Sequence, residues 1–198
     1  HTYVLVSDGD MQEGISHESA ALAGHQRLGN LIALYDYNLV QLDGPTSLAY
    51  SEDVGKRFGA YGWHVQQIDG MDYGAVDAAI RAAQAAGDRP SMIIARTHIG
   101  YGSPNKQDSS KAHGSPLGED EIVLTKRSYG WPEDKKFYVP DEALQHFRAA
   151  LDRGATRQRE WEQRFDAYAQ AHPDAAASLK LALGARLPDG WDSKLPTY

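Results

Sequence analysis

The sequence predicts an α/β fold in which a parallel, doubly wound sheet is flanked by helices and followed by a helical C-terminal extension. Three observations support this fold class. Short apolar runs alternate with helical patterns through the first two-thirds of the 198-residue chain. These segments follow one another as strand, helix, strand, helix, which is the order typical of βαβ units. Helical periodicity then continues near the C-terminus, carried by Trp161, Phe165 and Tyr168.

Four apolar runs are expected to form the strands. The first covers residues 2–6 and indicates a buried strand, because it is continuous and rich in β-branched and aromatic residues. The others cover residues 31–35, 63–68 and 91–97. Because helical segments separate these runs, we expect one parallel sheet, and ligands of such sheets bind at the carboxyl ends of the strands.

Helical patterns lie between these strands. Residues 14–28 place large apolar side chains among small ones, which favours a helix packed closely against the sheet. A short helix is expected at 53–61 and an alanine-rich one at 73–86. The alanine-rich helix is closed by a glycine and then by Pro90, which cannot continue it.

The character of the sequence changes after the fourth strand. Residues 98–118 are polar and rich in glycine and serine, and a loop of this length is usually functional or disordered. Later helices are expected at 119–129, 140–151 and 160–183, the last with a turn at His172-Pro173. We therefore expect a partial α/β domain over residues 1–130, a helical extension of it over 131–186, and a linker over 187–198.

Composition narrows the class of protein. The chain is 41% hydrophobic and 24% charged, as in ordinary soluble globular proteins, and its net charge of -7 argues against general nucleic-acid binding. It has no cysteine, which excludes disulfides and thiolate metal sites and fits a reducing compartment, so we expect a cytoplasmic protein. No membrane partner is expected, because no apolar stretch could cross a bilayer and no signal peptide is recognisable. The chain begins at His1 and enters a strand at once, so we expect a piece of a longer protein.

Acidic and amide side chains follow the first two strands. Asp8 and Asp10 come after the first strand, and Asp36 and Asn38 after the second. If these strands are neighbours, Asp8 and Asn38 lie together at the carboxyl edge of the sheet. The spacing fits neither an EF-hand loop nor a dinucleotide-binding GxGxxG motif. The plainest alternative is a solvated turn whose acids cap a helix.

The ligand types at this edge favour a hard divalent cation. One carboxylate, one amide carbonyl and one backbone carbonyl form an all-oxygen set, which Mg²⁺ or Ca²⁺ accepts. Mg²⁺ takes few protein ligands and completes its coordination with phosphate oxygens and water. The residues therefore predict a divalent cation that bridges the sheet edge to a phosphorylated ligand.

One resemblance makes this prediction specific. Asp8-Gly9, followed by Asn38 after a helix and a strand, resembles the thiamine-diphosphate signature, which reads G-D-G, about 25 to 30 residues, then N. The stretches in the same order are DGDMQEGISHESAALAGHQRLGNLIALYDYN (8–38), AYGWHV (60–65), IGYGSPNK (99–106), HGSPLG (113–118) and WDSKLPTY (191–198). Together they resemble transketolase over essentially the whole chain. The resemblance implies two cofactors, thiamine diphosphate and Mg²⁺, with Ca²⁺ or Mn²⁺ able to replace Mg²⁺.

Carried across position by position, the resemblance also implies a metal site. Its ligands would be the Asp8 carboxylate, the Asn38 side-chain carbonyl and the Val40 backbone carbonyl. Gly9 would let the backbone approach the diphosphate closely, and Ser7 would still offer a backbone N–H there.

Other positions match residues that surround the cofactor in this family. Leu42 and Ile99 match apolar positions that flank it, with plain core packing as the alternative. His113 matches a histidine near the diphosphate and the donor's terminal hydroxyl, and is the catalytic candidate. Glu13 and Glu18 match buried acids of a network that runs toward the dimer interface, and we count Glu13 among the cofactor-binding candidates.

Three positions depart from the family pattern. Ser7 stands where the family has its first glycine, and Asp10 stands where it usually has cysteine or alanine. Asp10 adds negative charge near a diphosphate site and is not explained by the resemblance. Tyr37 replaces a smaller or acidic residue.

The resemblance implies a homodimeric enzyme of the pentose phosphate pathway. It would transfer a two-carbon ketol unit from a ketose phosphate to an aldose phosphate. The segment before His1 and the domain that activates the cofactor are expected to be missing, so the isolated chain is expected to be inactive. Alternatives are a related thiamine-diphosphate enzyme such as dihydroxyacetone synthase, a split-gene subunit, and an inert α/β fragment or binding module.

Overall fold

The computed structural model describes residues 1–196. The chain forms two compact units, one over His1–Asp134 and one that begins at Lys135. Residues 197 and 198, the end of the predicted linker and of the WDSKLPTY stretch, lie outside the described residues.

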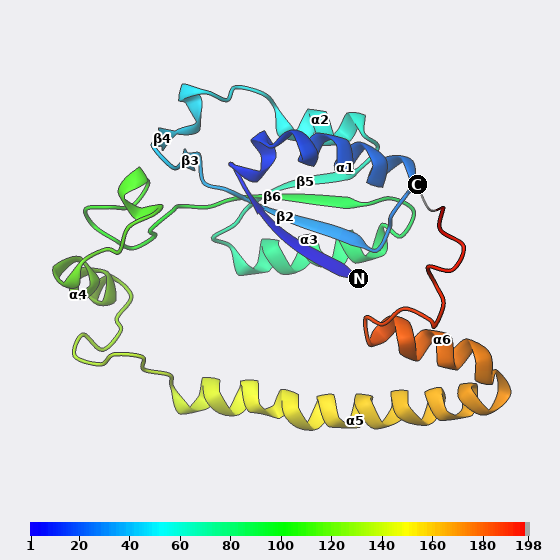
Figure 1. Cartoon of the computed structure of the whole chain (residues 1–198). Coiled ribbons are helices and arrows are strands. Elements are labelled where there is room, and N and C mark those ends of the chain that lie inside the picture. The colour runs from blue at the N-terminus through cyan, green and yellow to red at the C-terminus, as the bar shows by residue number, and fades with distance from the viewer. Residues whose placement is uncertain (197–198) are drawn as a thin grey trace. The chain divides into compact units, whose positions relative to one another are not determined.

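A parallel sheet forms the centre of the first unit, which confirms the predicted fold class (Figure 1). Its strands are β1 (Thr2–Ser7), β2 (Leu31–Tyr37), β5 (His64–Asp69) and β6 (Ser91–Arg96). Their spatial order is β1-β2-β6-β5, so the last strand of the sequence lies inside the sheet. A small antiparallel ribbon after β2, which the sequence did not predict, consists of β3 (Val40–Gln41) and β4 (Gly44–Pro45).

Helices cover both faces of this sheet. α1 (Gly14–His25) and α2 (Val54–Ala60) lie on one face, and α3 (Tyr73–Ala85) lies on the other (Figure 1). Aspartates cap two of these helices, as aspartate does at many helix starts. Asp53 accepts from the Lys56 backbone N–H of α2, and Asp72 accepts from the Gly74 and Ala75 backbone N–H groups of α3. The remaining short elements of this unit are η1 (Asp10–Gln12), η2 (Thr46–Leu48), η3 (Ser110–Ala112) and α4 (Glu119–Ser128).

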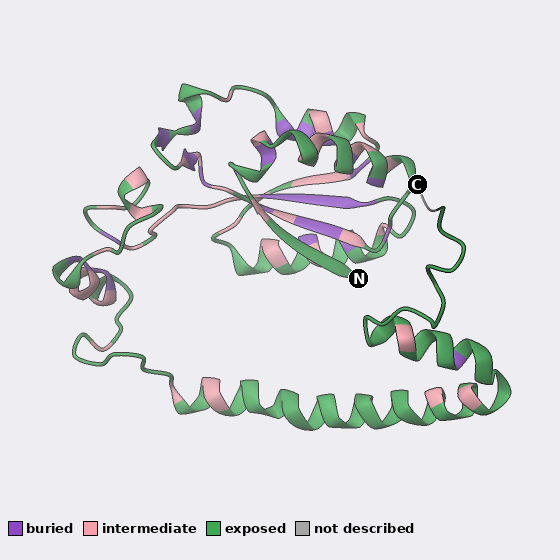
Figure 2. Ribbon diagram, viewed as in Figure 1, coloured by how far each residue is buried: buried purple, intermediate pink, exposed green. Residues whose placement is uncertain are grey.

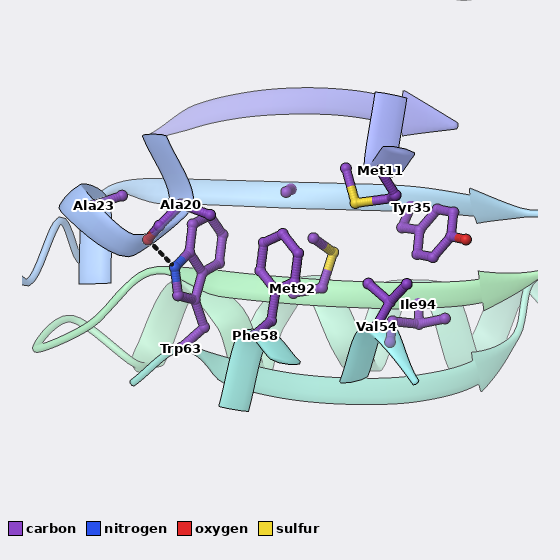
Figure 3. Close-up of a cluster of buried hydrophobic side chains, with 10 residues drawn as sticks. Met11, Ala20, Ala23, Tyr35, Val54, Phe58, Trp63, Met92 and Ile94 are labelled. Carbon is purple, nitrogen blue, oxygen red and sulfur yellow. Dashed lines mark hydrogen bonds between the residues drawn. The ribbon is translucent and has the colours of Figure 1, made fainter. Parts of the chain in front are cut away.

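The larger core lies between the sheet and the helices α1 and α2 (Figure 3). Phe58 and Trp63 pack edge to face with their ring centroids 5.0 Å apart, and Trp63 Nε1 donates to the Ala20 carbonyl at 2.8 Å. α1 passes so close to the end of α2 that a Cβ on Gly24 would lie 1.9 Å from the Tyr61 carbonyl oxygen. The smaller core under α3 consists of Ile32, Ala79, Ala83 and Ile93.

The prediction that the first strand is buried is wrong. β1 forms where expected, but most of its residues are exposed (Figure 2). Tyr3 is 48% exposed and Leu5 is 81% exposed. The reason is that β1 lies at the edge of the sheet, so within the described residues only β2 pairs with it. The apolar side chains of β1 are therefore largely exposed in this chain.

The second unit is a pair of consecutive helices, α5 (Asp141–Ala171) and α6 (Pro173–Leu183). The predicted break between residues 151 and 160 is wrong, because α5 runs through it without interruption. The intervening DRGATRQR contains good helix formers, and its one glycine costs only about 1 kcal/mol relative to alanine. The predicted turn at His172-Pro173 is confirmed, with Pro173 in the first turn of α6. Within residues 1–196, no helix has both the length and the apolar character needed to cross a membrane.

Candidate functional site

The carboxyl ends of β1 and β2 bring together the acid and the amide that the sequence singled out. β1 and β2 are parallel neighbours, with Ser7 opposite Asp36, so the residues that follow them leave the sheet side by side. Asp8 is 1% exposed and Asn38 is 8% exposed. The alternative of a solvated turn therefore does not describe Asp8, because its carboxylate is enclosed by protein.

Three donors hold the Asp8 carboxylate. The Tyr35 hydroxyl donates to Oδ1 at 2.7 Å. The backbone N–H groups of Asn38 and Leu39 donate to Oδ2 at 3.2 and 3.0 Å. These bonds join the end of β1 to the turn after β2, so they fix both the side chain and the turn that carries the expected metal ligands.

Burial raises the pKa of the Asp8 carboxyl above its usual range, and these three hydrogen bonds oppose that rise. The neighbouring Asp36 carboxylate raises the pKa of Asp8 further by repulsion. Burial, followed by the bond to Asp8, also raises the pKa of Tyr35, so the Tyr35 hydroxyl keeps its proton and acts as a donor. A cation beside Asp8 would reverse the balance and favour the charged carboxylate.

The Asn38 amide has a defined orientation. Its Oδ1 accepts from the Val40 backbone N–H at 3.0 Å, and its Nδ2 donates to Asp36 Oδ2 at 3.4 Å. In a flipped amide, the NH₂ group would face the Val40 N–H, which is also a donor, and the carbonyl oxygen would face the Asp36 carboxylate, which is also an acceptor. The Thr97 hydroxyl, which follows β6, donates to the other oxygen of Asp36. The end of β2, the start of β3 and the residue after β6 thus set the direction of the Asn38 carbonyl.

Gln12 and the β3–β4 ribbon complete this group. The Gln12 side-chain amide donates to the Asp8 backbone carbonyl at 3.2 Å and to the Gln41 side-chain carbonyl at 2.9 Å. Val40, whose carbonyl is the third expected ligand, is buried in β3 beside Gln41. Asp8, Asn38 and Val40 therefore lie within one hydrogen-bonded cluster.

Ser7 and Asp10, two of the departures from the family pattern, are partners. The Asp10 carboxylate accepts from the Ser7 backbone N–H at 2.7 Å and from the Ser7 hydroxyl at 2.8 Å. The Asp10 carboxylate therefore hydrogen-bonds within the turn that follows β1. The same bond occupies the Ser7 N–H, which was expected to face the phosphate.

Ile99 and His113 both lie in the long loop that follows β6. His113 is exposed and Ile99 is half-buried. A Cβ on Gly114 would lie 3.8 Å from Leu42 Cδ1, so the turn that carries His113 approaches the exposed Leu42. Ile99 receives the Asp108 backbone N–H at its carbonyl oxygen, at 3.0 Å.

A buried acid of α4 anchors this loop. Glu121 accepts from the Ser103 hydroxyl, and from the backbone and side-chain N–H groups of Asn105 at 2.8 and 2.9 Å. Hydrogen bonds from Ser103 and then Asn105 lower the pKa of Glu121 below its usual range. Glu121 thus fixes the start of the segment that leads to His113.

Glu13 immediately precedes α1 and Glu18 lies within it, and both side chains are exposed. Their predicted part in a network toward a second subunit stays a prediction.

Sequence reasoning missed Tyr35, Gln12 and Glu121 as residues of the site. Tyr35 ends an apolar run and reads as core, and Gln12 and Glu121 belong to no motif by themselves. The available signal was position: Tyr35 precedes the acid at a strand end, where side chains of adjacent strands meet.

The side chains and backbone oxygens at this edge can be compared with the ligands that a metal ion requires. Within residues 1–196, no cluster of three or more histidine, aspartate or glutamate side chains could hold a metal ion. A site at the β1–β2 edge must therefore use amide and backbone oxygens beside the single buried carboxylate. That set suits Mg²⁺, which needs few protein ligands and prefers oxygen. Gly9 adds space, since a Cβ there would meet only Ser7 Oγ, at 3.9 Å.

Comparison with known proteins gives one consistent family. The sequence profile of "Transketolase, thiamine diphosphate binding domain" matches residues 1–188. The chain is 46% identical over 200 aligned residues to a transketolase of Geobacillus stearothermophilus, covering 100% of this chain and 30% of that protein.

Solved structures agree. A transketolase from Leishmania mexicana superposes with a TM-score of 0.91 at 38% identity, covering 100% of this chain and 30% of that one. A transketolase from Pichia stipitis, in complex with sedoheptulose 7-phosphate, superposes with a TM-score of 0.90 at 38% identity, covering 100% of this chain and 29% of that one. The chain thus spans about a third of the length of these relatives or slightly less. It belongs to the transketolase family, and it matches the thiamine diphosphate binding domain of that family.

Proposed function

We propose that this chain is the segment of a transketolase that anchors the diphosphate of thiamine diphosphate through Mg²⁺. The observation that carries the proposal is the buried Asp8 carboxylate, held at the β1–β2 edge within the same hydrogen-bonded cluster as Asn38 and Val40. A cation beside this buried carboxylate would offset the cost of burying its charge. The family matched over residues 1–188 is named for the same cofactor.

The residues of the chain divide the work. Asp8, Asn38 and Val40 would hold Mg²⁺ through one carboxylate, one amide and one backbone oxygen. Gly9 would leave room for a phosphate group. Because the carboxylates near the site carry negative charge, a diphosphate could approach only after a cation had offset it.

Thiamine diphosphate, when bound, supplies the carbanion chemistry by which a two-carbon ketol unit passes from a ketose phosphate to an aldose phosphate. Support for sugar-phosphate substrates comes from the Pichia stipitis transketolase solved with sedoheptulose 7-phosphate. His113 would contribute near the diphosphate and the donor's terminal hydroxyl, since an imidazole can hold or release a proton near neutral pH. Leu42 and Ile99 would exclude water along the cofactor, and the complete enzyme would act as a homodimer.

The test replaces the expected ligands in the full-length enzyme that carries this segment. Asp8→Ala and Asn38→Ala should each lose thiamine diphosphate on gel filtration in Mg²⁺, whereas the parent keeps it. Asp43→Ala is the matched control, because Asp43 is an exposed acid in the β3–β4 turn, outside the expected ligand set. Full cofactor retention by either ligand variant would refute the assignment of that ligand.

The competing proposal of an inert fragment is tested with the isolated chain. We expect calorimetry to detect no tight Mg²⁺-dependent binding of thiamine diphosphate by the 198 residues alone. Tight binding would show that the cofactor site is complete within this segment.

A further inference from the structure

We infer that Tyr35 is a positioning residue, whose hydroxyl holds the Asp8 carboxylate in the orientation that leaves Oδ1 available to the metal. The inference rests on the proposed function, since it concerns the same metal site.

The hydrogen bonds distinguish the two oxygens of Asp8. A carboxylate oxygen has two lone pairs in the carboxylate plane. Oδ2 accepts from both the Asn38 and Leu39 N–H groups, so its lone pairs are engaged. Among the described residues, Oδ1 accepts only from Tyr35, at 2.7 Å, and keeps one lone pair. Oδ1 is therefore the oxygen that can accept a cation.

Tyr35 can define the position of Oδ1 because its own ring is fixed. The side chain is 1% exposed and packs with Met11, Val54 and Ile94, while its hydroxyl points toward the carboxyl ends of the strands (Figure 3). In the sheet it lies opposite Val6, two residues before Asp8. The hydroxyl thus has one place in the molecule, set by the sheet and the core.

Without that hydroxyl, only one of the two carboxylate oxygens stays anchored. The backbone N–H groups of Asn38 and Leu39 would still donate to Oδ2, but Oδ1 could rotate about that point. Hydrogen-bond partners of metal-ligating groups typically contribute 10- to 100-fold to metal affinity. Tyr35→Phe removes one oxygen atom and preserves the ring, so it tests orientation with little disturbance of the core.

The measurement is the apparent Mg²⁺ dissociation constant of the full-length enzyme, titrated calorimetrically at saturating thiamine diphosphate. Tyr35→Phe should weaken Mg²⁺ binding by at least about tenfold. Tyr37→Phe is the matched control, because it removes a hydroxyl of the same strand that makes no hydrogen bond to Asp8 in the structure of residues 1–196. It should stay within about twofold of the parent, well below the effect of a lost ligand partner.

Two further measurements make the outcome decisive. The thermal midpoint of each variant without metal distinguishes a merely structural role of Tyr35 from a positioning role. A structural role would lower the midpoint and leave the Mg²⁺ affinity unchanged. Unchanged or tighter Mg²⁺ binding by Tyr35→Phe would overturn the inference. Asp8→Ala, measured in parallel, separates the two proposals. If it loses Mg²⁺ while Tyr35→Phe does not, only the role of Tyr35 fails, whereas no effect of Asp8→Ala would refute the metal site itself.

Discussion

Replacing Asp8 with asparagine preserves the shape of the buried side chain and removes its charge. The asparagine oxygen can take the place of Oδ2 and accept from the Asn38 and Leu39 N–H groups. The new NH₂ group would then face Tyr35, whose hydroxyl can rotate and accept instead of donating. Every hydrogen bond of the carboxylate can therefore be kept, while the ability to bind a cation is lost.

The magnitude follows from two opposing effects. Three hydrogen bonds change from a charged to a neutral acceptor, at a loss of roughly 0.5–1 kcal/mol each. Burial of a charge without a partner ion costs several kcal/mol. The raised pKa of Asp8 shows that burial outweighs the hydrogen bonds. We therefore expect metal-free Asp8→Asn to be more stable than the parent at pH 7.5 by about 1–2 kcal/mol.

The sign of the pH dependence follows from the same shift. A carboxyl whose pKa is raised by folding adds stability in its protonated form, fully below the unfolded pKa of about 3.9. That stability is lost as the pH rises through the folded pKa. The difference between parent and variant should therefore shrink as the pH falls from 7.5 toward 4. Cofactor binding reverses the order, because ligand at about 100 times its dissociation constant stabilises the parent by about 2.7 kcal/mol and the variant not at all.

The assay is thermal denaturation of the full-length enzyme, first in EDTA and then with Mg²⁺ and thiamine diphosphate. In EDTA the variant should melt above the parent, and with both ligands it should melt below the parent. Asp43→Asn, which removes an exposed charge, should follow the parent in both conditions. A variant less stable than the parent in EDTA would refute the balance of burial and hydrogen bonding proposed for Asp8.

Two further predictions concern the surroundings of the site, and a third concerns the core. Asp10→Ala should destabilise the turn after β1 by about 1–2 kcal/mol. In a Ser7→Gly background, which removes the hydroxyl but keeps the backbone N–H donor to Asp10, the loss should be smaller but should persist, as a double-mutant cycle in urea would show. Glu121→Gln should speed hydrogen exchange at the Asn105 amide. In the parent, the protection factor of the Asn105 amide should be at its full value above the usual glutamate pKa, and it should fall as the pH drops through the lowered pKa of Glu121. A protection factor that stays constant over this pH range would contradict the role of Glu121 as an anchor. Trp63→Phe should reduce stability by about 1–3 kcal/mol, because it removes core volume and a hydrogen bond, and a urea midpoint equal to that of the parent would disprove the contact.

The strand-end residues were predictable because parallel βαβ order forces them together. Asp8 and Asn38 follow consecutive strands, and the carboxyl ends of neighbouring parallel strands meet at one edge. Tyr35 was not predictable in the same way. Its ring belongs to the core and only its hydroxyl reaches the site, and an apolar run does not reveal where one hydroxyl points.

Other features depend on partners that a linear pattern cannot identify. An apolar strand reads the same at the edge or in the centre of a sheet, so the exposure of β1 required the strand order. The continuity of α5 depended on a sum of moderate helix propensities around one glycine. The role of Asp10 depends on its partner Ser7, and the linear sequence does not show that these two departures from the family pattern bond to each other.

The exposed edge of β1 has a consequence for how this segment behaves alone. Strand edges that are apolar and carry neither lysine nor proline act as templates for another strand, and TYVLVS is such a sequence. At high concentration, isolated copies of the chain would pair edge to edge through their β1 backbones. Colloidal behaviour, more than the strength of its core, would then limit the concentration at which the segment stays monomeric, and light scattering over a dilution series would reveal that limit.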